Sequence, residues 1–217
     1  AGVTALAAQP FQTWLQVYGS VVANQTRMAA SYVEAGTATW NGGQGQVDGY
    51  VVGRTGGRGL DATLTVLGSS SSAGHATLQW NTTFTVAVSF ADTVVLESGG
   101  ATPFTTDVVN VGQRICAFGS LTLTTLDATA AGSVVRLLPT SVAGTAVGTP
   151  SGSTLTLDLL QVGPLDPSLF TWSDSGTSPP DPANFTLEIG TLATGLTIVP
   201  GTPRTASLLF GPVDDPS

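Results

Sequence analysis

Short runs of alternating polar and apolar residues cover most of the chain. In residues 61–67, Ala62, Leu64 and Val66 fall on one side, and threonines fall on the other. This period of two predicts β-strands that bury one face and expose the other. Clusters of glycine, proline and serine separate the runs and mark turns. We expect strands at residues 27–34, 46–54, 61–67, 77–80, 83–90, 94–96, 114–126, 133–138, 153–161, 185–189, 196–199 and 206–210.

The longest predicted strand covers residues 114–126, and residues 133–138 follow it after a turn of small residues. The two segments indicate a hairpin.

Leu123 in the first segment and Leu157 in a later strand fall on apolar faces, so both are expected in the core. A charge at either position is expected to abolish folding, because it would be buried without a partner.

One segment near the start follows a different period. Pro10 suits the first turn of a helix. Apolar side chains then recur at helical spacing, at Phe11, Trp14, Leu15, Tyr18 and Val22. We therefore expect one short helix in the N-terminal segment 1–22, packed over the end of a β core.

The spacing of the strands indicates the fold class. Many short strands without a βαβ rhythm or a fixed repeat are typical of an antiparallel sandwich or barrel. We predict an all-β protein, a single antiparallel β-sandwich of jelly-roll type that spans residues 1–217 as one domain. Residues 211–217 are expected to form a flexible tail.

The composition excludes several classes of protein. The chain has no lysine, six arginines, a net charge of −8, and 52 serines and threonines among its 217 residues. A hydrophobic fraction of 41% argues against a disordered chain, and the absence of a basic footprint argues against nucleic-acid binding. No run approaches about 18 apolar residues, so no transmembrane helix is expected. A single cysteine excludes an intramolecular disulfide framework.

No set of residues indicates catalysis, so we predict no catalytic, cofactor or metal site. His75 is the only histidine and follows a serine-glycine stretch, which is a poor place for a general base. Zinc sites need more Cys and His ligands than His75 and Cys116, and Cys116 is expected to be a buried small side chain. The glutamates show no pairing of the kind that glycoside hydrolysis needs; they are Glu34, Glu97 and Glu188.

Three further groups of residues have a functional interpretation beside a structural one. An irregular loop holds three aspartates that offer oxygen ligands to calcium, but their spacing does not match an EF-hand loop; they are Asp166, Asp174 and Asp181. The tryptophans are scattered, which favours packing over a sugar-stacking platform; they are Trp14, Trp40, Trp80 and Trp172. Asn-x-Thr sequons matter only if a eukaryotic host secretes the protein; they begin at Asn24, Asn81 and Asn184.

Two stretches carry a resemblance. Residues 10–22 combine the aromatic stripe with a following strand that reaches Tyr32, and residues 111–136 place Arg114, a long strand, a small turn, Gly132 and a second strand in order. Together they resemble jelly-roll capsid proteins of small icosahedral viruses, of the nodavirus-like and circular-ssDNA-virus-like groups. The resemblance implies a structural role in a virion. Those coats carry a basic arm for the genome, whereas a charge of −8 implies a shell surface or an arm outside this chain.

These observations favour a non-enzymatic structural protein that assembles into a viral capsid or virion shell. Its expected partners are copies of itself and other virion proteins, with no direct nucleic-acid contact and no membrane span. A surface low in charge suits extensive subunit interfaces, whose cores are depleted in charge. One alternative is a secreted cell-surface β-protein, extracellular or at the cell surface, such as a pilus subunit, adhesin or surface-layer component. A second alternative is a carbohydrate-binding module or hydrolase.

Overall fold

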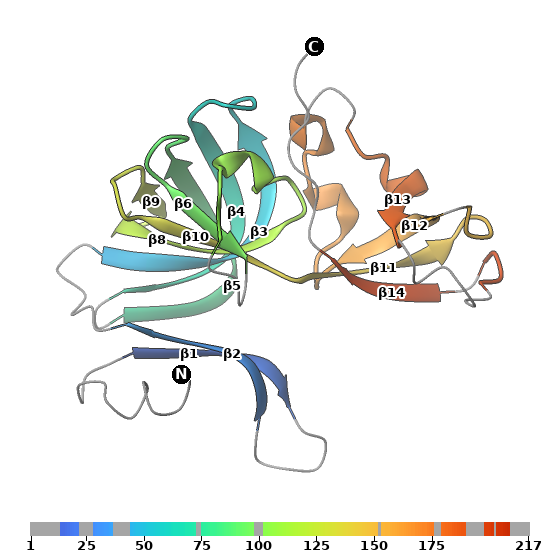
Figure 1. Ribbon diagram of the computed structural model, residues 1–217, viewed down its shortest axis with the longest axis horizontal. Coiled ribbons are helices and arrows are strands. Elements are labelled where there is room, and N and C mark those ends of the chain that lie inside the picture. Colours follow the sequence, from blue (N-terminus) through green and yellow to red (C-terminus); the bar gives the residue numbers. More distant parts are fainter. Residues whose placement is uncertain are drawn as a thin grey trace.

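The computed structural model describes residues 14–21, 28–36 and 44–208, with gaps at 73–74, 98–101, 152, 176–178, 190–197 and 202. These residues form β-strands and short 3-10 helices, which confirms the all-β class. The strands make a two-stranded hairpin, a larger eight-stranded sheet and a four-stranded sheet. Figure 1 shows the larger sheet on the left, the four-stranded sheet on the right and the hairpin below.

Five strands of the larger sheet close into a barrel. They follow the order β3–β4–β5–β9–β8, and β8 pairs again with β3. The first three are consecutive antiparallel strands with β8 beside the first, which is a Greek-key order. The closing pair β5–β9 is parallel. The bounds are β3 (Gln44–Thr55), β4 (Ala62–Ser72), β5 (His75–Val88), β8 (Arg114–Thr122) and β9 (Thr125–Ala128).

Three more strands extend the larger sheet from the first half of β8. Strand β10 (Val134–Leu138) pairs antiparallel with β8 and parallel with β6 (Val94–Glu97). Strand β7 (Pro103–Phe104) forms the edge beyond β6, and the 3-10 helix η1 (Thr106–Val108) follows it. Alternate side chains of these strands, apart from the exposed β7, form one hydrophobic core inside the barrel, including Val47, Val51, Leu64, Val66, Phe84, Val86, Ile115, Leu126 and Val135.

The four-stranded sheet is antiparallel throughout, in the order β13–β12–β11–β14. Its strands are β11 (Thr140–Ala146), β12 (Thr154–Val162), β13 (Phe185–Glu188) and β14 (Pro203–Leu208). Between β12 and β13 lie the 3-10 helices η2 (Pro167–Leu169), η3 (Trp172–Ser175) and η4 (Pro182–Asn184). Pro139 is the one residue between β10 and β11, so the chain passes directly from the larger sheet into this one.

Strand β3 contributes to two hydrophobic cores. Val47 and Val51 point into the barrel, whereas Tyr50 and Val52 belong to a second core against the four-stranded sheet. Period-two alternation explains this division, because neighbouring residues of a strand face opposite sides. The second core also holds Val111, Val142, Ala146, Leu155, Leu157, Leu159, Val162, Phe170, Trp172, Phe185, Leu187 and Ile198.

The expected N-terminal helix is wrong where the structure describes it. Residues Trp14–Val21 form strand β1, which pairs antiparallel with β2 (Met28–Gly36). The same residues alternate as well as they follow a helical period, and a short apolar run fits both patterns. Valine and aromatic residues favour strands, and Gly19 disfavours a helix. Residues 10–13 and 22 lie outside the described residues, as does the tail 211–217.

The predicted strand 114–126 is two strands, β8 and β9, joined by a tight turn. Leu123 lies in that turn and is 90% exposed, so its expected place in the core is wrong. Thr122 pairs with Thr125 and Leu121 pairs with Leu126, so a two-residue turn preserves the alternation on both sides of it. Leu157, in contrast, is fully buried as expected.

The described topology does not confirm a jelly-roll sandwich. The larger sheet closes on itself, and two of its strand pairs are parallel. Residues 114–118 pair antiparallel with residues 134–138, but strand β9 lies between them in the chain. The expected hairpin of residues 114–126 with residues 133–138 is therefore wrong as a direct hairpin, although its two ends do pair. That residues 1–217 form one domain stays a prediction.

The contrast between the two leucines can be tested by truncation. We expect Leu157→Ala to lower the free energy of unfolding by about 2–5 kcal/mol, because it leaves a cavity in the second core. Leu123→Ala is the matched control, and its effect should stay within about 0.5 kcal/mol because the side chain is exposed. Urea unfolding measures both. Equal losses for the two variants would contradict the placement of Leu123.

Candidate functional site

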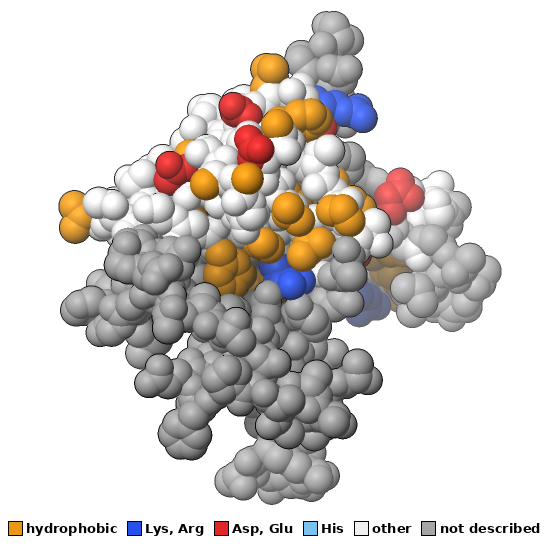
Figure 2. Space-filling view, turned by 60° about the vertical axis from the view of Figure 1, so that its left-hand side comes forward, with side chains coloured by type: hydrophobic (Ala, Val, Ile, Leu, Met, Phe, Trp, Pro, Cys, Tyr) orange, Lys and Arg blue, Asp and Glu red, His pale blue; other side chains and the backbone are white. Residues whose placement is uncertain are grey.

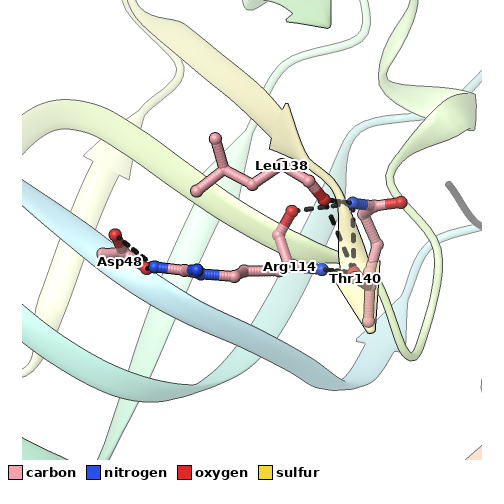
Figure 3. A network of polar contacts seen from close by, with 5 residues as sticks. Asp48, Arg114, Leu138 and Thr140 are labelled. Atoms are coloured by element: carbon pink, nitrogen blue, oxygen red, sulfur yellow. Dashed lines mark hydrogen bonds and ion pairs between the residues drawn. The ribbon is translucent and has the colours of Figure 1, made fainter. Parts of the chain in front are cut away.

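A polar cluster lies where the chain passes from the larger sheet into the four-stranded sheet. The Gln113 side chain is fully buried, and its amide nitrogen donates to the carbonyl oxygens of Leu138 at 2.6 Å and Arg114 at 2.8 Å. The backbone N–H of Arg114 donates to Thr140 Oγ1 at 2.8 Å. Figure 3 shows these contacts converging on the start of β11. Side chains thus satisfy backbone groups that the sheets leave unpaired at the crossover.

Asp48 and Arg114 form an ion pair beside this cluster, on the outer face of the barrel. Arg114 Nη2 lies 3.1 Å from Asp48 Oδ1 and 3.2 Å from Oδ2, and Arg114 Nε lies 3.2 Å from Oδ1. The Asp48 side chain is 13% exposed and that of Arg114 is 29% exposed. Burial raises the pKa of the Asp48 carboxyl and outweighs the opposing pull of Arg114. Burial also raises the pKa of the neighbouring Tyr50 hydroxyl.

The Asp48–Arg114 pair links two strands of the barrel. The Arg114 guanidinium contacts both carboxylate oxygens of Asp48 and joins β3 to β8 through side chains. A perturbed carboxyl with a charged partner is a reason to look for an active site. Among the described residues, no group of three or more His, Cys, Asp or Glu is placed to hold a metal ion. What the contacts show is that the pair joins β3 to β8 on the outer face of the barrel.

A second buried arginine fixes the loops at one end of the barrel. Arg54 Nη1 donates to the carbonyl oxygens of Val109 at 2.8 Å and Thr106 at 3.0 Å, and its Nε donates to that of Gly56 at 3.2 Å. Its backbone N–H donates to Asp174 Oδ2 at 3.2 Å. Burial lowers the pKa of Arg54, and nearby Asp107 opposes this. Arg54 therefore connects β3 to η1 and to the loop between β12 and β13.

The aspartates of that loop act one by one as local hydrogen-bond acceptors. Asp166 accepts from the N–H of Ser168 at 2.8 Å, and Asp181 accepts from that of Ala183 at 3.0 Å, so each caps a 3-10 helix. The side-chain hydrogen bonds of Ser168 to Asp166 and of Asn184 to Asp181, followed by these backbone bonds, lower the pKa of the two carboxyls. Asp174 instead accepts from Arg54. The structure does not bring the three together as calcium ligands.

The other residues considered from sequence lie far apart in the fold. His75 begins strand β5 rather than a loop, Glu34 lies in β2, and Glu97 and Glu188 end β6 and β13. Cys116 is fully buried, as predicted. Trp14 lies in β1 and Trp80 in β5, whereas Trp40 lies outside the described residues.

Trp172 has the packing role that the sequence indicated. Its ring stacks on Phe170 with centroids 5.1 Å apart and tilts against Phe185 at 6.2 Å. Its Nε1 donates to the carbonyl oxygen of Pro167 at 3.0 Å. Trp172 and Phe170 are both buried, so they hold the irregular loop against the second core and leave no stacking platform there.

The four-stranded sheet has one exposed face. Hydroxyl side chains cover it, from Ser141, Thr145, Thr154, Thr156, Thr186 and Thr205. Val147 and Leu160 add apolar area and are 50% and 54% exposed. Among the described residues of these four strands, the charged side chains are Asp158, Glu188 and Arg204. Figure 2 shows similarly scattered charges on the barrel side of the molecule.

Both outer strands of this sheet have one edge without a described partner. Strand β13 pairs only with β12, and β14 pairs only with β11, among the residues that the structure describes. Each has a single charged residue close to one end, Glu188 in β13 and Arg204 in β14. Unpaired edges are templates for pairing with another chain unless charge, proline or covering segments block them.

Comparisons with family models, with curated proteins and with solved structures found no match to this chain. No described helix has the length and apolar character that a membrane-crossing helix requires.

The raised pKa of Asp48 has a consequence for stability. A folded pKa above 3.8 means that the folded state holds this proton more tightly than the unfolded chain does. The stabilisation is complete below the unfolded pKa and is lost as the pH rises through the folded pKa. We expect Asp48→Asn, which does not titrate, to gain stability relative to the parent between about pH 3 and about pH 6. Urea midpoints across that range measure the difference, and a constant difference would contradict the shift.

Thr140→Val tests the crossover cluster. It keeps the side-chain shape but removes the oxygen that accepts from the Arg114 N–H, which leaves a half-buried donor unpaired. We expect a loss of about 1–3 kcal/mol in the free energy of unfolding. Thr145→Val, on the outer side of the same strand, is the control and should change it by less than about 0.5 kcal/mol. A similar small effect for both variants would show that the cluster does not hold the crossover.

Proposed function

We propose that the chain is a non-enzymatic structural subunit that assembles with copies of itself into a virion shell. The observation that carries the proposal is the four-stranded sheet, with an exposed hydroxyl-covered face and two edges that no described strand covers. A sheet edge can add a strand from another chain through backbone hydrogen bonds. Open edges promote aggregation of a protein that functions as a monomer, whereas a protein that assembles can use them to pair with its neighbours.

The edge strands have part of the usual protection, because β14 begins with Pro203 and Arg204 and β13 ends at Glu188, but neither strand has a lysine. Lysine is the residue that most often guards an edge, and the whole chain contains none. In β14 the stretch from Thr205 to Leu208 is uncharged, and in β13 only Glu188 carries a charge. Like charges facing each other across an interface cost several kcal/mol. Uncharged edges therefore allow two acidic copies to approach at these places.

The resemblance to viral coats supports a virion shell among the possible assemblies. Residues 111–136 carry it better than residues 10–22, because β8 and β10 form an antiparallel pair whereas Trp14–Val21 is a strand in place of the expected helix. A net charge of −8 argues against contacts with the genome, which leaves copies of the chain and other virion proteins as the proposed partners. A jelly-roll relationship rests on the resemblance alone.

A fibre at a cell surface is the second candidate, and one observation favours it. The two uncovered edges lie on opposite sides of one sheet. Pairing β13 of one copy with β14 of the next is a head-to-tail contact, and such contacts make rings if they close and open filaments if they do not. A pilus subunit or surface-layer component would use the same edges.

Added lysines test whether the edges drive assembly. Thr186 and Thr205 are exposed residues of the two edge strands, so Thr186→Lys and Thr205→Lys should oppose pairing with another copy. We expect assembly to need about tenfold more protein, or to be lost, because each copy brings the same charge. Sedimentation velocity measures the change, and negative-stain microscopy distinguishes shells from fibres.

Thr63→Lys is the matched control. Thr63 is equally an exposed strand threonine, but it pairs with Thr55 on one side and Ala87 on the other. Its variant carries the same added charge on a strand that has no free edge, so assembly should be unchanged. Parent protein that stays monomeric at high concentration would overturn the proposed function. Edge variants that assemble like the parent would overturn the role of the edges.

A further inference from the structure

The tip of the β8–β9 hairpin combines two unfavourable features in one residue. Leu123 is 90% exposed, the highest value among the exposed large hydrophobic side chains of the described residues. It also has a φ of 54°, and no other described residue besides glycine has a positive φ. Thr122 and Thr125 pair directly below it, so Leu123 occupies the first position of a two-residue turn.

Turn chemistry alone favours another residue at this place. Two-residue hairpin turns with a positive φ at their first position normally use glycine, asparagine or aspartate there. Leucine adds backbone strain, since its Cβ crowds the backbone in the left-handed region. Its side chain also adds no hydrophobic stabilisation to its own chain, because it is exposed and does not pack in the core. An observed backbone outlier of this kind is a reason to look for a function.

The charges around the tip indicate what Leu123 contacts. No charged residue lies between Arg114 and Asp127, so the upper part of the hairpin is neutral in a chain of net charge −8. Two copies of an acidic chain repel each other least where they meet through neutral segments. An anionic lipid surface is a poor partner, because membrane-binding segments use basic residues to reach it and the tip has none.

We propose that Leu123 is the apolar anchor of a contact between two copies of this chain, in which the hairpin tip inserts among side chains of the neighbouring copy. This inference rests on the proposed self-assembly and names one contact of it. A single leucine buries too little surface to hold a pair of proteins together, since a standard interface needs roughly 800 Å² from each partner. The anchor therefore acts within a larger contact, or as one of many repeated in an assembly.

The variant Leu123→Asn tests the contact between copies without weakening the fold of each copy. Asparagine tolerates the left-handed region and is polar, so the thermal melting of the variant should match or exceed that of the parent. We expect the dissociation constant of assembly to rise about tenfold or more, as for the loss of one buried leucine. Leu60→Asn is the control, because Leu60 is 60% exposed in the β3–β4 loop and its variant should assemble like the parent.

A label at the same position gives a second readout. The only native cysteine, Cys116, is fully buried, so Leu123→Cys adds one accessible thiol for an environment-sensitive fluorophore. We expect the emission to shift to shorter wavelength on assembly, because the label leaves water. Addition of vesicles of anionic lipid to dilute, monomeric protein should cause no such shift, and a shift there would overturn the choice of partner.

The outcomes distinguish this inference from the proposed function. If the parent assembles and Leu123→Asn assembles equally well, Leu123 is not an anchor between copies, and the proposed function is unaffected. If Leu60→Asn weakens assembly as much as Leu123→Asn does, the effect is a general one of surface apolarity and the anchor also fails. If the lysine edge variants assemble normally and Leu123→Asn does not, the edges of β13 and β14 have no role in assembly, and the contact through Leu123 is supported. Parent protein that remains monomeric overturns both.

Discussion

The hydrogen bonds along both edges of β8 hold the larger sheet together. On one edge β8 pairs with β3 from Arg114 to Ser120, and this pairing closes the barrel. On the other edge its first half pairs with β10 and its last residues pair with β9. Strand β9 in turn reaches β5, and β10 reaches β6, so both branches of the sheet start from this one strand. Without β8, the other four barrel strands would be an open sheet with no fixed route to the second sheet.

The position of the second sheet follows from that closure. Arg114 begins β8, and its backbone N–H binds Thr140 in β11 while its side chain binds Asp48 in β3. Arg114 thus connects β8 to β3 and to the start of β11. Gln113 completes the connection by satisfying the carbonyl of Leu138 just before the chain bends at Pro139. The exposed face and the two edges proposed for assembly are held in place by this small set of polar contacts, whose groups are costly to leave unpaired once buried.

Local patterns in the sequence predict the strands well where one face is buried. Residues 61–67 and 153–161 alternate cleanly, and they form much of β4 and β12. The turn at Leu123 was not predictable, because no Gly, Asn, Asp or Pro marks it and the alternation runs past Leu123 as far as Thr124. The strand at Trp14–Val21 was missed because its residues fit two periods, and its partner strand decides between them. Barrel closure depends on pairings between distant segments, which no local pattern contains.

For the candidate site, the sequence offered weaker signals. Pro139 after an apolar run was the available sign that the chain changes sheets there. Gln113 beside apolar residues was the sign of a buried polar group. Neither residue type reveals which backbone groups it will satisfy. The uncovered edges of β13 and β14 are likewise a property of sheet order and not of any single residue.

Because β3 lines both hydrophobic cores, the barrel and the four-stranded sheet are mechanically continuous. Tension applied to the second sheet reaches β3 through Tyr50 and Val52, and from there the closed barrel through Val47 and Val51. These contacts act beside the single covalent link at Pro139. An assembly built from such subunits would have to pull Tyr50 and Val52 out of the second core before the four-stranded sheet could move away from the barrel.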